Sequence, residues 1–139
     1  MLREGAFLPQ DGQNLPSDSS NGNLMLFDNT GIDKRSRVLE IDPRSGEVVW
    51  RYERTERPVF FSLCCGTNQR LPNGNTLITE TQKGRAFEVD RGGRSVWEYR
   101  NPHRVGEDQQ TLANLFEVLR LPSGFADGWV TPPHPAPVP

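Results

Sequence analysis

Apolar and polar residues alternate in short stretches through the middle of the chain. Residues 85–90 and 95–99 alternate so that one face of each stretch is apolar, which predicts half-buried strands. Residues 75–80 form a further β-rich run directly after Asn73-Gly74, a strong hairpin signal because both residues tolerate a positive φ. The glycine pair in 91–93 turns the chain between the last two strands. We therefore expect three antiparallel strands in this part of the chain.

The same order of elements occurs earlier in the chain. Strands are predicted at 24–27, 37–41 and 47–52, with a turn at 42–46 between the last two. A further strand is predicted in 59–71, from the apolar run 59–63 or from 66–71. That strand is the innermost member of the second set. Each set then forms an antiparallel sheet, and the predicted fold class is all-β.

The two sets share residues as well as element order, with a period of about 50 residues. Four correspondences follow one another in the same order along the chain. They are Asn21-Gly22-Asn23 with Asn73-Gly74-Asn75, Leu39-Glu40-Ile41-Asp42 with Phe87-Glu88-Val89-Asp90, Trp50-Arg51-Tyr52 with Trp97-Glu98-Tyr99, and Leu71-Pro72-Asn73-Gly74 with Leu121-Pro122-Ser123-Gly124.

A strand repeat of this period is typical of a β-propeller. We predict a propeller fragment of about two four-stranded antiparallel blades plus part of a third, whose innermost strand is expected at 115–121. Since propellers close with about four to eight blades, we expect further blades or a homo-oligomer to complete the ring. The predicted division is 1–20 partial strand and linker, 21–58 partial blade, 59–100 blade, 101–127 start of the next blade, and 128–139 disordered Pro-rich tail.

Composition excludes several classes of partner. The 139 residues carry a formal net charge of -2, with basic and acidic residues interspersed, so no nucleic-acid partner is expected. No apolar run approaches the ~20 residues of a membrane span, and no membrane partner is expected. Residues 1–5 lack the apolar core of a signal peptide, which leaves the compartment open; we expect the natural N-terminus to precede Met1. Cys64 and Cys65 are adjacent, unlike zinc ligands, and we expect neither a metal nor a cofactor.

Trp50 and Trp97 occupy matching places on the outermost predicted strands. A tryptophan at this place is expected to bury its ring against the neighbouring blade while its N–H reaches a backbone carbonyl. The alternative interpretation is an aromatic platform for a ligand.

Several segments together resemble the arylsulfotransferase family over about 21–121. The first reads Asn-Gly-Asn-Leu-Met-Leu-Phe-Asp-Asn at 21–29, and Ser36 to Pro43 with Gly46 to Trp50 resembles the next stretch of the family. The run at 66–78 is similar to the family's "AQRLPNGNTLI" segment. Residues 84–90, 96–99 and 114–120 continue the likeness.

The resemblance implies a six-bladed propeller in an exported bacterial enzyme. Such enzymes move a sulfuryl group from an aryl sulfate to a phenol without 3′-phosphoadenosine-5′-phosphosulfate. A histidine in the central channel carries the sulfuryl group covalently, which divides one difficult transfer into two easier ones. The implied partners are therefore an aryl sulfate and a phenol.

The candidate catalytic residue is His103, in a loop that leaves an outer strand. His134 lies in the Pro-rich tail and is not favoured. Members of the family commonly carry a histidine before the first "NGN" segment, whereas 10–14 here contain none. Candidate substrate-binding residues are Gln69 and Arg70, at the end of the presumed inner strand, with Arg120 at the matching point of the third unit. The plainer interpretation is an exposed loop histidine for His103 and a solvated arginine beside a turn for Arg70.

Two other functions fit the sequence. The absence of histidine from the predicted inner strands favours a non-catalytic propeller that serves as a scaffold or binding module. The third hypothesis is a quinoprotein-like propeller. Asp42-x-x-Ser45-Gly46-x-x-x-Trp50 resembles the tryptophan-docking repeat of quinone-dependent dehydrogenases, but the interval from Asp90 to Trp97 is one residue shorter.

Overall fold

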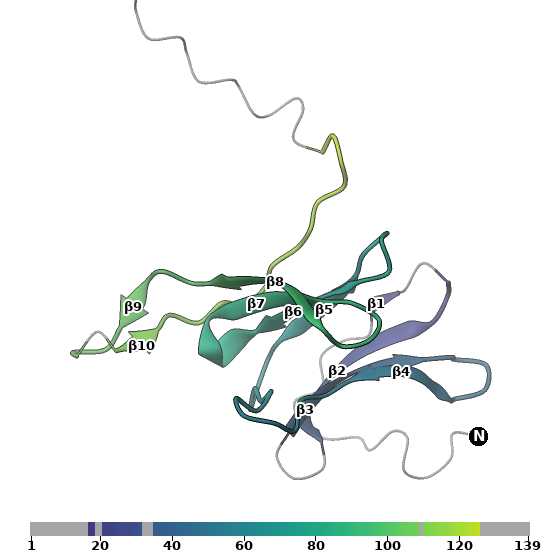
Figure 1. Cartoon of the computed structure of the whole chain (residues 1–139), viewed down its shortest axis with the longest axis horizontal. Coiled ribbons are helices and arrows are strands. Elements are labelled where there is room, and N and C mark those ends of the chain that lie inside the picture. The colour runs from purple at the N-terminus through teal and green to yellow at the C-terminus, as the bar shows by residue number, and fades with distance from the viewer. Residues whose placement is uncertain (1–16, 19–20, 32–34, 109, 126–139) are drawn as a thin grey trace, which may run out of the picture.

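The computed structural model describes residues 17–18, 21–31, 35–108 and 110–125. Within these ranges the regular structure is almost entirely β-strand, arranged in two four-stranded sheets and one small hairpin (Figure 1). The exception is a single 3-10 turn, η2 (Thr81–Lys83). None of the described helical segments is long and apolar enough to cross a membrane.

The first sheet is an antiparallel meander with the strand order β1-β2-β3-β4. The strands are β1 (Ser17–Asp18), β2 (Leu24–Gly31), β3 (Arg35–Ile41) and β4 (Val48–Tyr52). β1 pairs only with the first two residues of β2, Leu24 and Met25. Most of one edge of β2 therefore has no strand partner among the described residues.

The second sheet repeats this arrangement with the order β5-β6-β7-β8. Its strands are β5 (Thr67–Arg70), β6 (Thr76–Glu80), β7 (Arg85–Val89) and β8 (Ser95–Arg100). The register of the third and fourth strands shifts after Glu40 in the first sheet and after Glu88 in the second. The irregularity thus falls at the same place in both sheets.

The turns that enter both sheets have the same local structure. Gly22 and Gly74 have φ angles of 80° and 87°, which favour glycine. The side-chain oxygen of Asn21 accepts a hydrogen bond from the backbone N–H of Asn23, and Asn73 does the same for Asn75. Such Asx turns bend the chain into the following strand.

The main core lies between the two sheets, and aromatic rings form its centre. The Phe60 ring lies 5.5 Å from the rings of Phe27 and Tyr52 and 5.8 Å from that of Phe87. The first sheet, the second sheet and the loop that joins them therefore share one core. Its buried members are Met25, Phe27, Val38, Tyr52, Phe60, Ile78, Phe87 and Val89.

Alternation along the strands gives the first sheet a second apolar face. Leu26, Leu39 and Ile41 point away from the shared core and form a separate buried cluster. They occupy the positions in the first sheet that Ile78, Phe87 and Val89 occupy in the second.

The structure confirms the all-β class and the two four-stranded antiparallel sheets, an arrangement consistent with two blades of a propeller. Residues 66–71 supply the innermost strand, β5, but 59–63 form no strand. This run instead crosses between the sheets, where the carbonyl of Phe60 accepts a hydrogen bond from Ser36. The expected polar loop contains a hairpin of β9 (Arg104–Val105) and β10 (Thr111–Leu112).

Residues 115–121, the expected inner strand of a third blade, form no strand. Instead they run along the second sheet, where the N–H of Val118 donates to the hydroxyl of Thr79. The strand prediction was wrong here because no described strand offers this segment a backbone partner. The boundaries between blades stay predictions, and the segments 1–16 and 128–139 lie outside the described residues.

Candidate functional site

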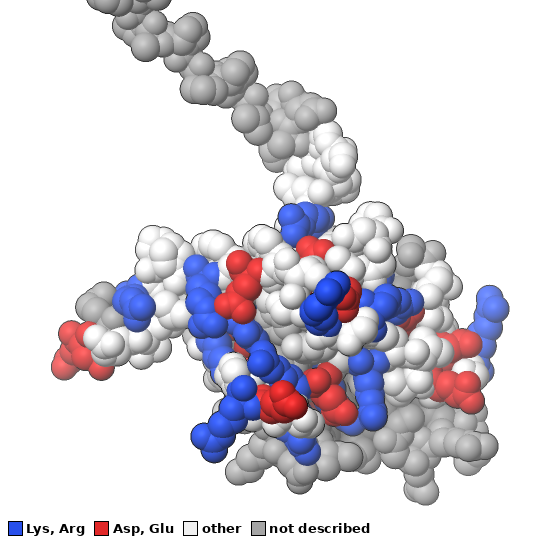
Figure 2. Space-filling model, viewed as in Figure 1, with Lys and Arg blue, Asp and Glu red and all other residues white. Residues whose placement is uncertain are grey.

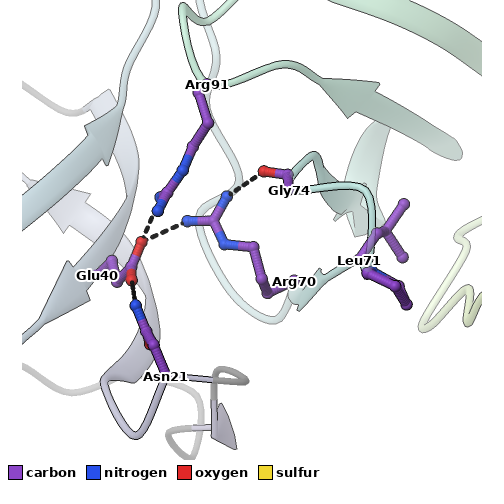
Figure 3. Close-up of a pocket in the computed structure, with 7 residues that line it drawn as sticks. Asn21, Glu40, Arg70, Leu71, Gly74 and Arg91 are labelled. Atoms are coloured by element: carbon purple, nitrogen blue, oxygen red, sulfur yellow. Dashed lines mark hydrogen bonds and ion pairs between the residues drawn. The ribbon is translucent and has the colours of Figure 1, made fainter.

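The most elaborate polar site surrounds the carboxylate of Glu40 on β3. Glu40 is 1% exposed, and its Oε1 accepts hydrogen bonds from the side-chain amides of Asn21 (3.0 Å) and Asn23 (2.9 Å). Its Oε2 accepts from the guanidinium groups of Arg70 (2.6 Å) and Arg91 (2.5 Å) (Figure 3). Both arginines belong to the second sheet, so this carboxylate joins the two sheets.

Arg70, at the end of β5, has most of its donors occupied. Its Nη1 donates to the carbonyl of Gly74 at 3.0 Å and to the hydroxyl of Thr76. Its guanidinium carbon lies 4.5 Å from the centre of the Trp50 ring, a cation–π contact. The side chain is 5% exposed, and its Nε has no partner within the described ranges.

Trp50 closes the site from β4. Its indole N–H donates to the backbone carbonyl of Arg91 at 2.9 Å, in the turn between β7 and β8. The ring is half-buried and packs against the shared core. The prediction that this tryptophan docks on the neighbouring sheet through its N–H is therefore confirmed for Trp50.

The surroundings of Glu40 set its ionisation. Burial acts to raise the pKa of this carboxyl, but hydrogen bonds from Asn21, Asn23 and Arg91 and the charge of Arg70 outweigh it and lower the pKa to about 2. Burial and the charge of Arg91 lower the pKa of the Arg70 guanidinium. The Glu40 carboxylate is therefore ionised at neutral pH.

A pocket of about 90 Å³ opens beside this ion pair. Its charged lining combines one carboxylate with two guanidinium groups. Both guanidinium groups already pair with Glu40, and the half-exposed Arg91 is the one of the two that an incoming anion can reach. The lining residues are Asn21, Glu40, Arg70, Leu71, Pro72, Gly74 and Arg91.

The second sheet carries a matching site around Glu88 on β7. Its carboxylate accepts from the amides of Asn75 (2.6 Å) and Asn73 (3.4 Å) and from the guanidinium of Arg120 (3.0 Å). Arg120 also lies over the ring of Trp97, 5.2 Å from its centre. The hydrogen bond from Asn75 is the main cause that lowers the pKa of Glu88.

The site at Glu88 lacks two contacts that the site at Glu40 has. Within the described residues, no second guanidinium contacts Glu88 and no carbonyl accepts the N–H of Trp97. Trp97 is 39% exposed, so its predicted burial against a neighbouring blade is not realised in this chain. The reason is that no third four-stranded sheet packs beside the second within the described residues, and the ring of Trp97 instead contacts the ring of Tyr99 and the guanidinium of Arg120.

The side chain of Gln69 makes two hydrogen bonds with the backbone of Arg120. Its side-chain nitrogen donates to the carbonyl of Arg120 at 3.1 Å, and its side-chain oxygen accepts from the N–H of Arg120 at 2.8 Å. Gln69 and Arg120 are therefore brought together, while Arg70 and Arg120 each pair with a different glutamate. The idea that Gln69, Arg70 and Arg120 bind a substrate stays a prediction; the observed geometry gives all three structural contacts.

His103 lies between β8 and β9 on the surface. Its backbone N–H donates to the side chain of Asn101 at 3.1 Å, and its carbonyl accepts from Ala113 at 2.8 Å. These bonds fix the backbone and leave the exposed imidazole open to a reactant. Its catalytic role stays a prediction, and His134 lies outside the described residues.

A second pair of buried ionic contacts escaped the sequence analysis. Glu80 on β6 is fully buried and pairs with Arg85 (2.8 Å) and Lys83 (2.7 Å). Asp28 and Arg37 form the matching pair in the first sheet. The repeat aligns these residues, so the pairing was open to prediction from the acidic and basic residues at equal places.

The adjacent cysteines form no metal cluster. Cys64 is exposed, whereas Cys65 has a φ of 61° and its carbonyl accepts a hydrogen bond from Asn29. Among the described residues, no three His, Cys, Asp or Glu side chains gather closely enough to hold a metal ion. Basic and acidic side chains are intermixed over the face shown in Figure 2.

Fold and site together define an all-β protein whose antiparallel four-stranded sheets interlock through buried carboxylates, arginines and a tryptophan. The family model for arylsulfotransferase (ASST) matches residues 4–102, and the chain therefore belongs to the arylsulfotransferase family. No curated protein and no solved structure matches the chain significantly. The family resemblance is thus confirmed, and a sulfotransferase-like function in general is supported. His103 and Arg120 lie beyond the matched residues.

Proposed function

We propose that the chain provides blades of a propeller that transfers a sulfuryl group from an aryl sulfate to a phenol. Membership of the arylsulfotransferase family over 4–102 is the observation that carries the proposal. The two interlocked sheets support it, because each repeats the same strand order and the same buried polar contacts. Two blades do not close a ring, so the proposal places the reaction in an assembly with more blades.

The proposed reaction has two steps through His103. A neutral ring nitrogen attacks the sulfur of the aryl sulfate; the N–S bond forms as the S–O bond breaks, and the aryl oxide leaves with the electron pair. The acceptor phenol then attacks the sulfur, and the N–S bond breaks. The phenol's proton is returned in net terms to the released aryl oxide, so atoms and charge balance. A neutral imidazole is a competent nucleophile near pH 7.

Two features of the chain support His103 in this role. The hydrogen bonds to Asn101 and Ala113 hold its backbone in place, and its side chain is exposed. Arg104 follows it directly, and its Nη1 donates to the carbonyl of Gln110 at 3.2 Å. A guanidinium at this position offers its remaining donors to sulfuryl oxygens.

The test is release of a coloured phenol from an aryl sulfate, with and without a second phenol as acceptor. We expect release that depends on the acceptor and is lost in His103→Ala. His134→Ala is the matched control and should keep the activity. Release that survives in His103→Ala would remove His103 from the reaction, and no release by the unchanged chain would remove transfer activity from the chain itself.

A non-catalytic scaffold is the second candidate function, and one observation favours it. The guanidinium of Arg70 is neutralised by Glu40 and that of Arg120 by Glu88. Neither arginine is then free to stabilise charge on a sulfuryl group. Under this alternative, Glu40→Gln would alter stability and leave any trace of aryl sulfate turnover unchanged.

A further inference from the structure

The two cysteines lie next to each other in the loop that joins the two sheets. Cys64 and Cys65 fall between β4 and β5, outside the strands of either sheet (Figure 1). Both are free thiols; Cys64 is exposed and Cys65 is half-buried. A hydrogen bond with the Cys64 thiol, together with burial, raises the pKa of the Cys65 thiol. The two sulfur atoms are therefore in contact, and the pair reaches solvent through Cys64.

Buried polar groups hold the backbone of both cysteines. The hydroxyl of Ser62 donates to the carbonyl of Cys64 at 2.8 Å, and the side-chain amide of Asn29 donates to the carbonyl of Cys65. Ser62 and Asn29 are themselves buried. Ser62 is held in turn by Ser36, whose hydroxyl accepts a hydrogen bond from its backbone N–H at 2.8 Å. The thiols thus project from a backbone that the first sheet keeps in place.

The backbone conformation of Cys65 is unusual. Its φ is 61°, and within the described ranges no other residue except glycine has a positive φ. A side chain in this region is strained, and such a conformation persists only where the surroundings over-determine it. Gly66 follows directly and approaches the Phe27 ring so closely that an added Cβ would lie 2.5 Å from it. Because this packing fixes the pair, a ligand that takes both thiols needs to order little additional chain.

The spacing of the two cysteines disfavours a disulfide between them. Disulfides usually join Cα atoms about 4.4–6.8 Å apart, whereas neighbours across a trans peptide are only about 3.8 Å apart. The peptide bond between Cys64 and Cys65 is trans. An ion placed between the sulfur atoms, with metal–sulfur bonds of roughly 2.3 Å, lets the sulfurs stay as much as about 4.6 Å apart. The pair therefore suits the chelation of one ion better than oxidation.

The number of ligands narrows the class of ion. Zinc takes four ligands in structural sites and three protein ligands in catalytic sites, and iron–sulfur clusters take four ligands, mostly thiolates. Among the described residues, no group of three His, Cys, Asp or Glu side chains lies close enough together to hold such a centre. Monovalent copper is a soft ion that prefers thiolates, and two of them are enough to hold it. The spacing that excludes zinc does not exclude this ion.

We propose that Cys64 and Cys65 bind one Cu(I) ion between their sulfur atoms. Binding replaces two S–H bonds by two Cu–S bonds; both protons go to solvent, and no electron is transferred. The ion enters at the exposed Cys64, and Cys65 supplies the second sulfur. This site does not require sulfuryl transfer, so this inference and the proposed function fail separately.

The experiment is a competition for Cu(I) between the full chain and bicinchoninate, whose violet copper complex is followed by absorbance. It is carried out under nitrogen with ascorbate as the reductant. We expect the unchanged chain to withdraw one Cu(I) per chain. Cys64→Ser and Cys65→Ser should each weaken binding by more than about 100-fold, since loss of a direct ligand exceeds the effect of an outer partner. Leu63→Ala changes a 59% exposed neighbour in the same loop and is the matched control, which should bind as the unchanged chain does.

Stoichiometry and mass separate chelation within one chain from a bridge between chains. The copper-loaded chain should keep the sedimentation mass of the copper-free chain. One ion per two chains, with a doubled mass, would overturn the proposal because the exposed Cys64 of two copies would then share the ion. Copper retained by the double variant Cys64→Ser with Cys65→Ser would also overturn it, since other residues would be responsible. Failure of the unchanged chain to withdraw copper would overturn it as well.

Discussion

The guanidinium of Arg70 and the carboxylate of Glu40 lie 2.6 Å apart, although they belong to different sheets. Both side chains are buried, and the Trp50 ring stacks on the guanidinium. A buried ion pair with this many hydrogen bonds is sensitive to the loss of one partner, since the remaining charge stays desolvated.

Loss of the buried arginine is the first prediction. Arg70→Ala should lower the free energy of unfolding by about 3 kcal/mol or more, because Glu40 keeps its burial and loses a partner. Arg94→Ala is the control: Arg94 is 81% exposed and pairs with Asp90, so its loss should cost less than about 1 kcal/mol. Urea unfolding measures both. Equal costs for the two variants would contradict the structural importance of the pair.

Acid should destabilise the fold through Glu40. The pKa of this carboxyl is about 2 in the fold, against an ordinary value of 4.5, so the unfolded chain binds the proton more tightly. Its contribution to stability is complete above about pH 4.5 and is lost as the pH falls to about 2. The shift corresponds to about 3 kcal/mol at neutral pH.

Glu40→Gln tests the origin of this pH dependence. The variant should be less stable at pH 7, and its urea midpoint should fall less steeply between pH 5 and pH 2. Glu88 has a lowered pKa as well, so a smaller slope in the same direction should remain. An unchanged slope would assign the acid sensitivity to other carboxyl groups.

The close approach of Gly66 to the core gives a third prediction. Gly66 has a φ of 107°, and a Cβ there would lie 2.5 Å from the Phe27 ring. Gly66→Ala should therefore cost backbone strain of about 1 kcal/mol plus repacking of about 1–3 kcal/mol. Gly22 has a φ of 80°, but a methyl group added there would meet open space. Gly22→Ala should therefore cost only the backbone strain of about 1 kcal/mol. Thermal unfolding of the two variants compares them directly.

Phe60 tests whether the two sheets share one core. Phe60→Ala removes the ring that contacts Phe27, Tyr52 and Phe87, and should cost about 3–5 kcal/mol. Leu63→Ala changes a 59% exposed side chain of the same loop and should stay within about 0.5 kcal/mol. A single unfolding transition that shifts as a whole would confirm one core, while two separate transitions would contradict it.

The strands were predictable because their signals are local. Alternation at 85–90 and the turn at Asn73-Gly74 depend only on neighbours in sequence, and both sheets follow from them. The same reasoning predicted a strand at residues 59–63, where there is none. A short apolar run has the same sequence pattern whether it pairs in a sheet or crosses a core without pairing. Phe60 fills a gap between two sheets, and its surroundings come from distant parts of the chain.

The site was harder to predict for the same reason. The repeat places Arg70 and Arg120 at equal points, so the sequence alone relates the two residues, while their role in substrate binding stays a prediction. Their glutamate partners are not predictable from local pattern, since Glu40 and Glu88 lie on strands that show only ordinary alternation, and each pairs with an arginine far away in sequence. The recurrence of Asn, Glu, Trp and Arg at equivalent positions of both repeats is the sequence signal that indicates one shared kind of contact.

The donors that satisfy Glu40 come from both sides of its position in the chain. Asn21 and Asn23 precede it, whereas Arg70 and Arg91 are synthesised later. On the ribosome, the first sheet therefore emerges with a half-satisfied carboxylate and an uncovered aromatic face. The carboxylate gains its full set of partners only when about 40 residues beyond Tyr52, up to Arg91, have left the exit tunnel, so the smallest unit able to fold independently during translation is the pair of sheets.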